Sequence, residues 1–142
     1  MLPFDEPLRA LVVEDSDADY QTTCDLLDGA RLVTFTIERV RTVAEALPRL
    51  NSGACDVCLL EPAPPDGPGV ELLRTAQNRD CRAPIIVLTR CGSPELDLEA
   101  MALGAADFLD KGQVDAALLE RAVRYAIARH REAARLDRLA QY

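Results

Sequence analysis

The sequence predicts an α/β fold: a five-stranded parallel sheet, doubly wound, with helices on both faces and an extended C-terminal helix. Three observations predict it. Five short apolar runs alternate with helix-like stretches along the 142 residues. Several of these runs are apolar at every position, as strands buried on both faces are. The length suits a single domain of ordinary size, and 49% of the residues are hydrophobic, which is enough to fill one core.

The strands are expected in the runs LRALVV, VTFTIERV, DVCLL, PIIVLT and DFLD. The first, third and fourth runs are continuously apolar at residues 11–13, 57–60 and 85–88, so we expect them at the centre of the sheet. The second run alternates, with Val33, Phe35 and Ile37 on one side and polar residues on the other. That alternation predicts an edge strand.

Capping signals mark the predicted helix ends. Thr42 and Glu45 form a capping-box pattern, and Ser93 before Pro94 reads as an N-cap followed by a first-turn proline. Glycines suit the ends of three helices, at Gly29, Gly53 and Gly104. Apolar residues at four-then-three spacing give two helices one apolar stripe each: Tyr20, Cys24 and Leu27, then Leu96, Ala100 and Leu103. Pro48 falls inside the second helix and should shorten or kink it.

The last helix is expected to begin near Gln113 and meets no glycine or proline before Tyr142, so it could run about 40 Å at 1.5 Å per residue. That exceeds the sheet it covers. We therefore divide the chain into a domain at residues 1–128 and an extension of the last helix at 129–142, a linker or a dimerisation segment. The apolar positions hold no clean heptad, so a short coiled coil and a fraying helix stay open as alternatives.

Composition excludes several classes of function. Sixteen basic and 24 acidic residues give a net charge of -8, which repels nucleic acid and anionic lipid. The chain shows no signal-peptide pattern and no apolar run of about 18 residues, so we expect a cytoplasmic protein without membrane contact. Five cysteines suit a reducing compartment. The pair Cys55 and Cys58 enters a predicted strand, which favours core packing over redox or zinc chemistry.

Polar groups follow the predicted strands at their carboxyl ends, where open parallel sheets collect functional groups. Glu14 and Asp15 follow the first strand and Glu61 the third, while Thr89 ends the fourth and Lys111 follows the fifth. Three carboxylates so close repel one another unless a cation or a proton neutralises them. Mg²⁺ prefers such oxygen ligands. Lys111, the single lysine of the chain, is the other candidate counter-charge.

These residues resemble the receiver domain of two-component response regulators over about residues 6–128. The resemblance rests on the segments LVVEDSDADY, CDVCLLEPAPPDGPGVELL, PIIVLTR and GAADFLDKG. It implies strand order 2-1-3-4-5 and a phosphoryl-accepting site with Mg²⁺. It also implies residue roles: Glu14 and Asp15 as the acidic pair that holds the metal, the Ala63 carbonyl as a backbone ligand, Thr89 as the hydroxyl that reports phosphorylation, Phe108 as the switch aromatic, Lys111 as the phosphoryl contact, and Pro65 and Gly67 in the loop after the third strand.

The sequence departs from the family at Glu61, where members carry the aspartate that accepts the phosphoryl group. One extra methylene moves the carboxylate by about 1.5 Å, in a reaction where a misplacement of about 1 Å can cost 10²-fold. Efficient phosphoryl acceptance is therefore not expected. Instead, Glu61 places a permanent negative charge near Thr89 and Lys111 and mimics the phosphorylated state. Arg90, where the family usually has a small residue, is expected to cover the site entrance or to pair with Glu61.

We therefore expect an atypical receiver, not an enzyme, that acts as a protein-interaction or dimerisation module for a signalling partner or an output domain. Mg²⁺ is held by Glu14, Asp15, Glu61 and Ala63, or is made unnecessary by Lys111. A homodimer would form through the face of the last strand or through the terminal helix. Two alternatives stay open: a conventional Mg²⁺-dependent phosphoacceptor, and the N-terminal receiver of a larger sensor kinase or cyclic-nucleotide-synthesising protein.

Overall fold

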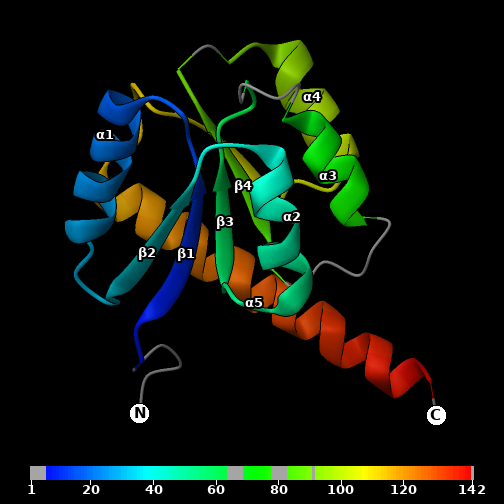
Figure 1. Cartoon of the computed structure of the whole chain (residues 1–142). Coiled ribbons are helices and arrows are strands. Elements are labelled where there is room, and N and C mark those ends of the chain that lie inside the picture. Colours follow the sequence, from blue (N-terminus) through cyan, green and yellow to red (C-terminus); the bar gives the residue numbers. More distant parts are fainter. Residues whose placement is uncertain (1–5, 64–68, 78–82, 91, 142) are drawn as a thin grey trace.

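The computed structural model describes residues 6–63, 69–77, 83–90 and 92–141 (Figure 1). Strands and helices alternate along the chain: β1 Leu8–Val13, α1 Asp17–Asp28, β2 Phe35–Val40, α2 Val43–Ser52, β3 Val57–Leu60, α3 Val70–Gln77, β4 Ile85–Thr89, α4 Pro94–Ala102, β5 Asp107–Asp110 and α5 Ala116–Ala140. The strands are parallel and lie in the order β2-β1-β3-β4-β5. The predicted fold class and strand order are confirmed.

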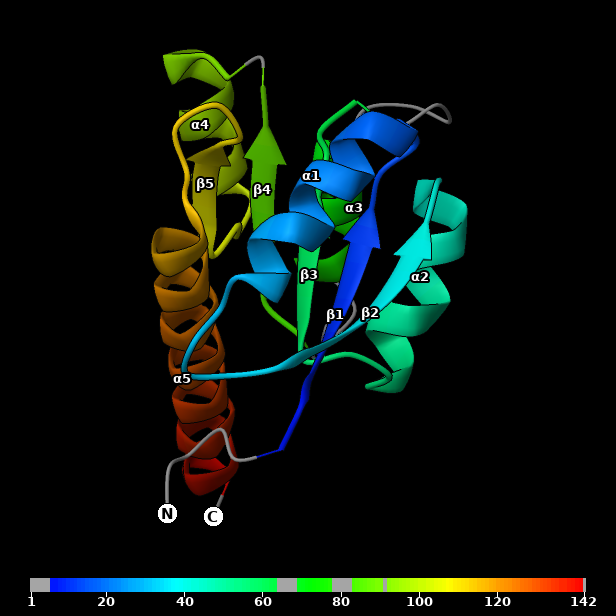
Figure 2. The same cartoon turned by 90° about the vertical axis from the view of Figure 1, so that its left-hand side faces the viewer.

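Helices cover both faces of the sheet (Figures 1 and 2). Helices α1 and α5 pack on one face, over a core that includes Leu59 and Ile86. Helices α2, α3 and α4 pack on the other, over a core that includes Leu60 and Val87. Successive strand residues therefore face opposite layers. Every residue of β3 and β4 is buried, as the continuous apolar runs predict, and β2 alternates at the edge.

Most predicted helix ends are present. The Thr42 hydroxyl accepts the N–H of Glu45 at 3.1 Å, and the Ser93 hydroxyl caps α4 in the same way. Gly53 ends α2 at φ 74°, in the left-handed region that favours glycine. Pro48 does not end the second helix, because α2 continues through it to Ser52. Pro48 itself is exposed.

Two boundaries differ from the prediction. Strand β2 begins at Phe35 rather than Val33, because the N–H groups of Leu32 and Val33 donate to the Glu120 carboxylate of α5, at 2.8 and 3.2 Å. Helix α5 begins at Ala116. Its N-cap, Asp115, accepts the N–H of Leu118 at 2.8 Å.

Helix α5 is longer than the layer it covers. Its 25 residues span about 38 Å at 1.5 Å per residue. Buried side chains such as Leu119, Val123 and Ile127 hold its first half on the sheet. The final turns project past the strand ends that lie opposite the arrowheads, as predicted (Figures 1 and 2). In the described part of the chain, no helix is both long enough and apolar enough to cross a membrane.

Candidate functional site

The carboxyl ends of the central strands gather charged side chains at one edge of the sheet. Backbone hydrogen bonds continue past the strands and fix the positions of the residues that follow. The N–H of Glu61 donates to the Val13 carbonyl at 3.1 Å, and the N–H of Lys111 donates to the Thr89 carbonyl at 2.9 Å. Glu61 therefore lies beside the end of β1, and Lys111 beside the end of β4.

Lys111 lies at the centre of this edge, with a side chain that is 2% exposed. Its Nζ contacts Glu14 Oε1, Glu61 Oε2 at 2.8 Å and Asp19 Oδ2 at 3.4 Å. Burial by itself lowers the pKa of Lys111, but its hydrogen bonds and charge interactions with Glu14 and Glu61 outweigh burial, so the pKa is raised above its ordinary value. The pocket therefore holds a charged ammonium among carboxylates, and Glu61 is one of its partners.

The third carboxylate of the cluster is Asp19 rather than Asp15. Oxygens of Glu14, Asp19 and Glu61 lie within 4.8 Å of one another. The Asp15 side chain is 53% exposed, and its Oδ1 lies 3.4 Å from Arg41. Neighbouring side chains at the end of a strand point to opposite sides, so only Glu14 of the acidic pair enters the cluster. Asp19 reaches it from the first turn of α1, and the only sequence signal for it is the acidic run DSDAD.

Arg90 pairs with Asp19, so its predicted pairing with Glu61 is wrong. Its Nε lies 2.7 Å from Asp19 Oδ1, and the Arg90 side chain is 49% exposed. This hydrogen bond, helped by Lys111, lowers the pKa of Asp19. Asp19 also contacts Lys111. The Asp19 carboxylate therefore links Arg90 to the cluster, and Arg90 lies on the solvent side of that cluster.

Thr89 and Phe108 lie close together beside the cluster. Thr89 is buried at the end of β4, and Phe108 is half-buried on β5. A Cβ atom on Gly92 would lie 3.0 Å from Phe108 Cε1 and 3.4 Å from Thr89 Cγ2. Gly92 therefore leaves space for the aromatic ring next to Thr89, a role that the sequence analysis missed.

Gly69, just before α3, lies against the main chain of the residues that follow β3. The N–H of Gly69 donates to the Pro62 carbonyl at 2.7 Å, and a Cβ on Gly69 would lie 2.9 Å from the Glu61 carbonyl oxygen. Only glycine leaves room for this close approach of residue 69 to Glu61 and Pro62.

The chain is similar in sequence and fold to known proteins. Residues 10–124 match the model of the response regulator receiver domain family. The chain belongs to this family. It is 34% identical over 133 residues to the transcriptional regulatory protein FixJ of Azorhizobium caulinodans, covering 93% of this chain and 61% of that protein. It is 35% identical over 104 residues to the swarming motility regulation protein RssB of Serratia marcescens, covering 73% and 46%. The receiver thus spans less than two thirds of either relative.

Solved receiver structures share the fold. A response regulator receiver domain protein from Methanospirillum hungatei aligns at a TM-score of 0.74 and 22% identity, covering 90% of this chain and 99% of that one. The structure titled FixJ-N aligns at 0.72 and 25% identity, covering 87% and 95%. Receiver domains are signalling modules of two-component systems and are generally not enzymes.

Receiver domains typically bind Mg²⁺ at acidic residues, and this receiver has an acidic cluster. Carboxylate oxygens are suitable ligands for such an ion. The Lys111 ammonium, however, already lies within 3.4 Å of all three carboxylates, so a divalent ion fits only if Lys111 moves. Ala63, the predicted backbone ligand, is exposed after β3. Pro65 and Gly67 lie outside the described residues.

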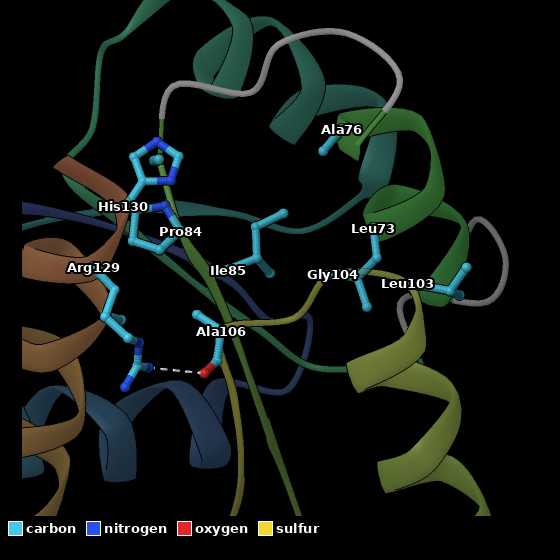
Figure 3. Close-up of a pocket in the computed structure, with 11 residues that line it drawn as sticks. Leu73, Ala76, Pro84, Ile85, Leu103, Gly104, Ala106, Arg129 and His130 are labelled. Carbon is cyan, nitrogen blue, oxygen red and sulfur yellow. Dashed lines mark hydrogen bonds between the residues drawn. The ribbon is translucent and has the colours of Figure 1, made fainter. Parts of the chain in front are cut away.

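A cavity of about 410 Å³ lies away from the carboxylate cluster, beside the first residues of β4 (Figure 3). Apolar side chains such as Leu73 and Ile85 line it, together with Arg129 and His130 of α5. The Arg129 guanidinium donates to the Ala106 carbonyl at 3.1 Å, so it ties α5 to the start of β5. None of the described residues that line this cavity is acidic, and we assign the functional site to the acidic edge.

Proposed function

We propose that this receiver works without phosphorylation, with Glu61 at the phosphoacceptor position as a fixed charge. The observation that carries the proposal is the 2.8 Å contact between Glu61 Oε2 and the buried Nζ of Lys111. A carboxylate held by this ammonium is not free to attack phosphorus, and in-line attack tolerates little misplacement. Lys111 is thereby supplied with the anionic partner that a phosphoryl group provides in the family's scheme.

A receiver with a fixed pocket charge serves as a protein-interaction module. Its partner would be a signalling protein, an output domain or a second copy of the chain. The greater length of FixJ and RssB supports an output domain. Exposed apolar side chains on α4 and α5 support an interaction surface beside β5: Leu98, Met101, Leu118 and Tyr125. The net charge of -8 argues against direct nucleic-acid binding, and a cytoplasmic location is expected.

Within this proposal, Thr89 and Phe108 keep the positions of the family's switch pair but are held in one arrangement. The Phe108 ring and the Thr89 side chain both lie against the space that a Cβ on Gly92 would fill, which supports this. Residues 1–128 form the receiver, and residues 129–142 act as a linker or dimerisation segment. The projection of the last turns of α5 past the sheet supports the division.

Intact-mass measurement after incubation with Mg²⁺ and acetyl phosphate tests the proposal. The wild-type chain should show no adduct of about 80 Da, the mass added by a phosphoryl group. Glu61→Asp should gain one, because the shorter side chain withdraws from Lys111 and restores the family's acceptor. Glu61→Gln has no carboxylate at position 61 and is the control for adducts on other residues. An adduct that maps to Glu61 in the wild-type chain overturns the proposal.

Two other functions have specific support. A conventional Mg²⁺-dependent phosphoacceptor is favoured by the oxygens of Glu14, Asp19 and Glu61, which lie close enough to share one ion. The N-terminal receiver of a larger protein, such as a sensor kinase or a cyclic-nucleotide-synthesising protein, is favoured by relatives in which the matched region is a small part. The response regulator PilR of Pseudomonas aeruginosa is one, with 22% of its length covered.

A further inference from the structure

We propose that Arg39 and Arg41 set the cation preference of the acidic pocket: they hold the loop between β1 and α1 so that the pocket takes the Lys111 ammonium and not a divalent metal ion. Arg39 lies on the edge strand β2, and Arg41 is the first residue after this strand. The inference rests on the proposed function, because it names the side chains that make the fixed ion pair independent of metal.

Arg39 is held on several sides. Its Nε donates to the Glu14 carbonyl at 2.9 Å and its Nη2 to the Asp15 carbonyl at 3.2 Å. Its Nη1 lies 2.9 Å from Asp17 Oδ1. The guanidinium also lies over the Tyr20 ring, 4.5 Å from the centroid, and the side chain is only 18% exposed. The planar fork of an arginine can satisfy this set of acceptors at once, whereas a lysine cannot.

Arg41 also binds the loop between β1 and α1. Its Nη1 donates to the Asp15 carbonyl at 3.0 Å and lies 3.4 Å from the Asp15 carboxylate, while its Nη2 lies 3.1 Å from Asp17 Oδ1. Hydrogen bonds from Arg39 and Arg41 lower the pKa of Asp17, so this carboxylate stays charged at neutral pH. Asp15 is thus held by both its carbonyl and its carboxylate, outside the pocket.

Exposed ion pairs alone contribute little to stability, so the hydrogen bonds to the carbonyl oxygens hold the loop. Three guanidinium hydrogen bonds end on main-chain oxygens of Glu14 and Asp15. They fix the path of the backbone, and the path decides which side chain of the acidic pair faces Lys111. With the loop in this position, Glu14 faces inward and Asp15 faces outward.

The charges of this region nearly balance without an added ion. Five carboxylates take part in its ion pairs, and four cationic side chains oppose them, which leaves one excess negative charge: Glu14, Asp15, Asp17, Asp19 and Glu61 against Arg39, Arg41, Arg90 and Lys111. Removing both loop arginines would leave three excess negative charges and free Asp15 to turn inward. A divalent cation would then gain both a stronger field and a fourth oxygen ligand.

The test is a titration with Mn²⁺, which prefers the same oxygen ligands as Mg²⁺ and broadens nearby amide NMR signals. The wild-type chain should bind Mn²⁺ weakly. Arg39→Gln/Arg41→Gln should bind it about tenfold more tightly or better, within the range by which outer partners change metal affinity. Arg49→Gln is the matched control, because Arg49 is 47% exposed, close to the 48% of Arg41, and pairs with Glu38 away from the loop.

Adding Asp15→Asn to the double variant should remove most of the gain, because it takes away the new carboxylate ligand and one of the two added negative charges. An unchanged Mn²⁺ affinity in a folded double variant overturns the inference, and so does a gain that Asp15→Asn does not reduce or that appears equally in Arg49→Gln. If the double variant does not fold, Arg41→Gln alone is titrated against the same criteria, since Arg41 is half exposed. The mass measurement on the wild-type chain tests the proposed function without touching either arginine, so the two failures are distinguishable.

Discussion

At the residue scale, the single lysine of the chain is bound by carboxylates that come from three elements of the fold. Glu14 follows β1, Asp19 lies in α1, and Glu61 follows β3. An ammonium is a compact point charge with three donors, and this pocket presents three acceptors within 3.4 Å of it. Glu61 carries one methylene more than aspartate, and its Oε2 lies 2.8 Å from Lys111 Nζ.

Replacing Lys111 with methionine keeps the length of the side chain but removes the central cation. Three carboxylates would then face one another in a buried setting, so we expect the free energy of unfolding at pH 7 to fall by about 3–5 kcal/mol. Urea denaturation followed by circular dichroism measures it. Lys111→Met/Glu61→Gln should recover part of the loss, and Arg49→Met, which breaks an exposed ion pair, should change stability by less than about 0.5 kcal/mol. A loss no larger than that of Arg49→Met would contradict the role of Lys111.

The raised pKa of Lys111 also fixes the sign of an alkaline pH dependence. The folded state binds this proton more tightly than the unfolded state, so the contribution is complete below the unfolded value of about 10.4. It is lost as the pH rises through the higher folded pKa. We expect the stability difference between the wild-type chain and Lys111→Met to shrink in that window, in urea denaturation repeated at rising pH. A constant difference would show that Lys111 acts through packing instead of charge.

At the element scale, the strands could be predicted because β1, β3 and β4 are short apolar runs bounded by polar residues. Their order was implied by the family resemblance, since no local pattern encodes which strands are neighbours. The start of β2 could not be predicted, because it depends on Glu120, which lies 87 residues from Val33 in sequence. The same holds for Asp19: its entry into the cluster depends on how the first turn of α1 sits over the sheet edge.

Helix α2 carries a proline at an exposed interior position, Pro48. A proline inside a helix costs about 3 kcal/mol, but it also restricts the unfolded chain and so recovers part of that cost. We expect Pro48→Ala to raise the free energy of unfolding by about 1 kcal/mol in urea denaturation. Pro94→Ala is the control, because Pro94 opens α4, where proline is favourable, and its loss should not stabilise. A destabilised Pro48→Ala variant would mean that the proline packs against a neighbour.

At the scale of the whole molecule, the carboxyl ends and the amino ends of the strands present different surfaces. The acidic cluster lies at the carboxyl ends of the strands, and the last turns of α5 project beyond the opposite edge (Figures 1 and 2). Helix α5 joins both regions. It is held on the sheet by its buried face, and Glu120 and Arg129 tie it to the α1–β2 loop and to the start of β5. These contacts of α5 with the rest of the domain therefore fix the direction in which its projecting end points.

Leu136 and Leu139 on this projecting end are 53% and 58% exposed and, three residues apart, lie on one side of α5. Burying the exposed half of the four leucines of two chains would contribute about 3–7 kcal/mol. Association itself costs about 4–15 kcal/mol, so we expect a weak dimer that forms only at high concentration. Sedimentation equilibrium of the full chain measures it. Leu136→Glu/Leu139→Glu should remove the dimer, whereas Leu32→Glu, equally exposed at 58% but in the α1–β2 loop, should keep it. A dimer that survives the double substitution would place the contact on the face of β5 instead and leave residues 129–142 as a linker.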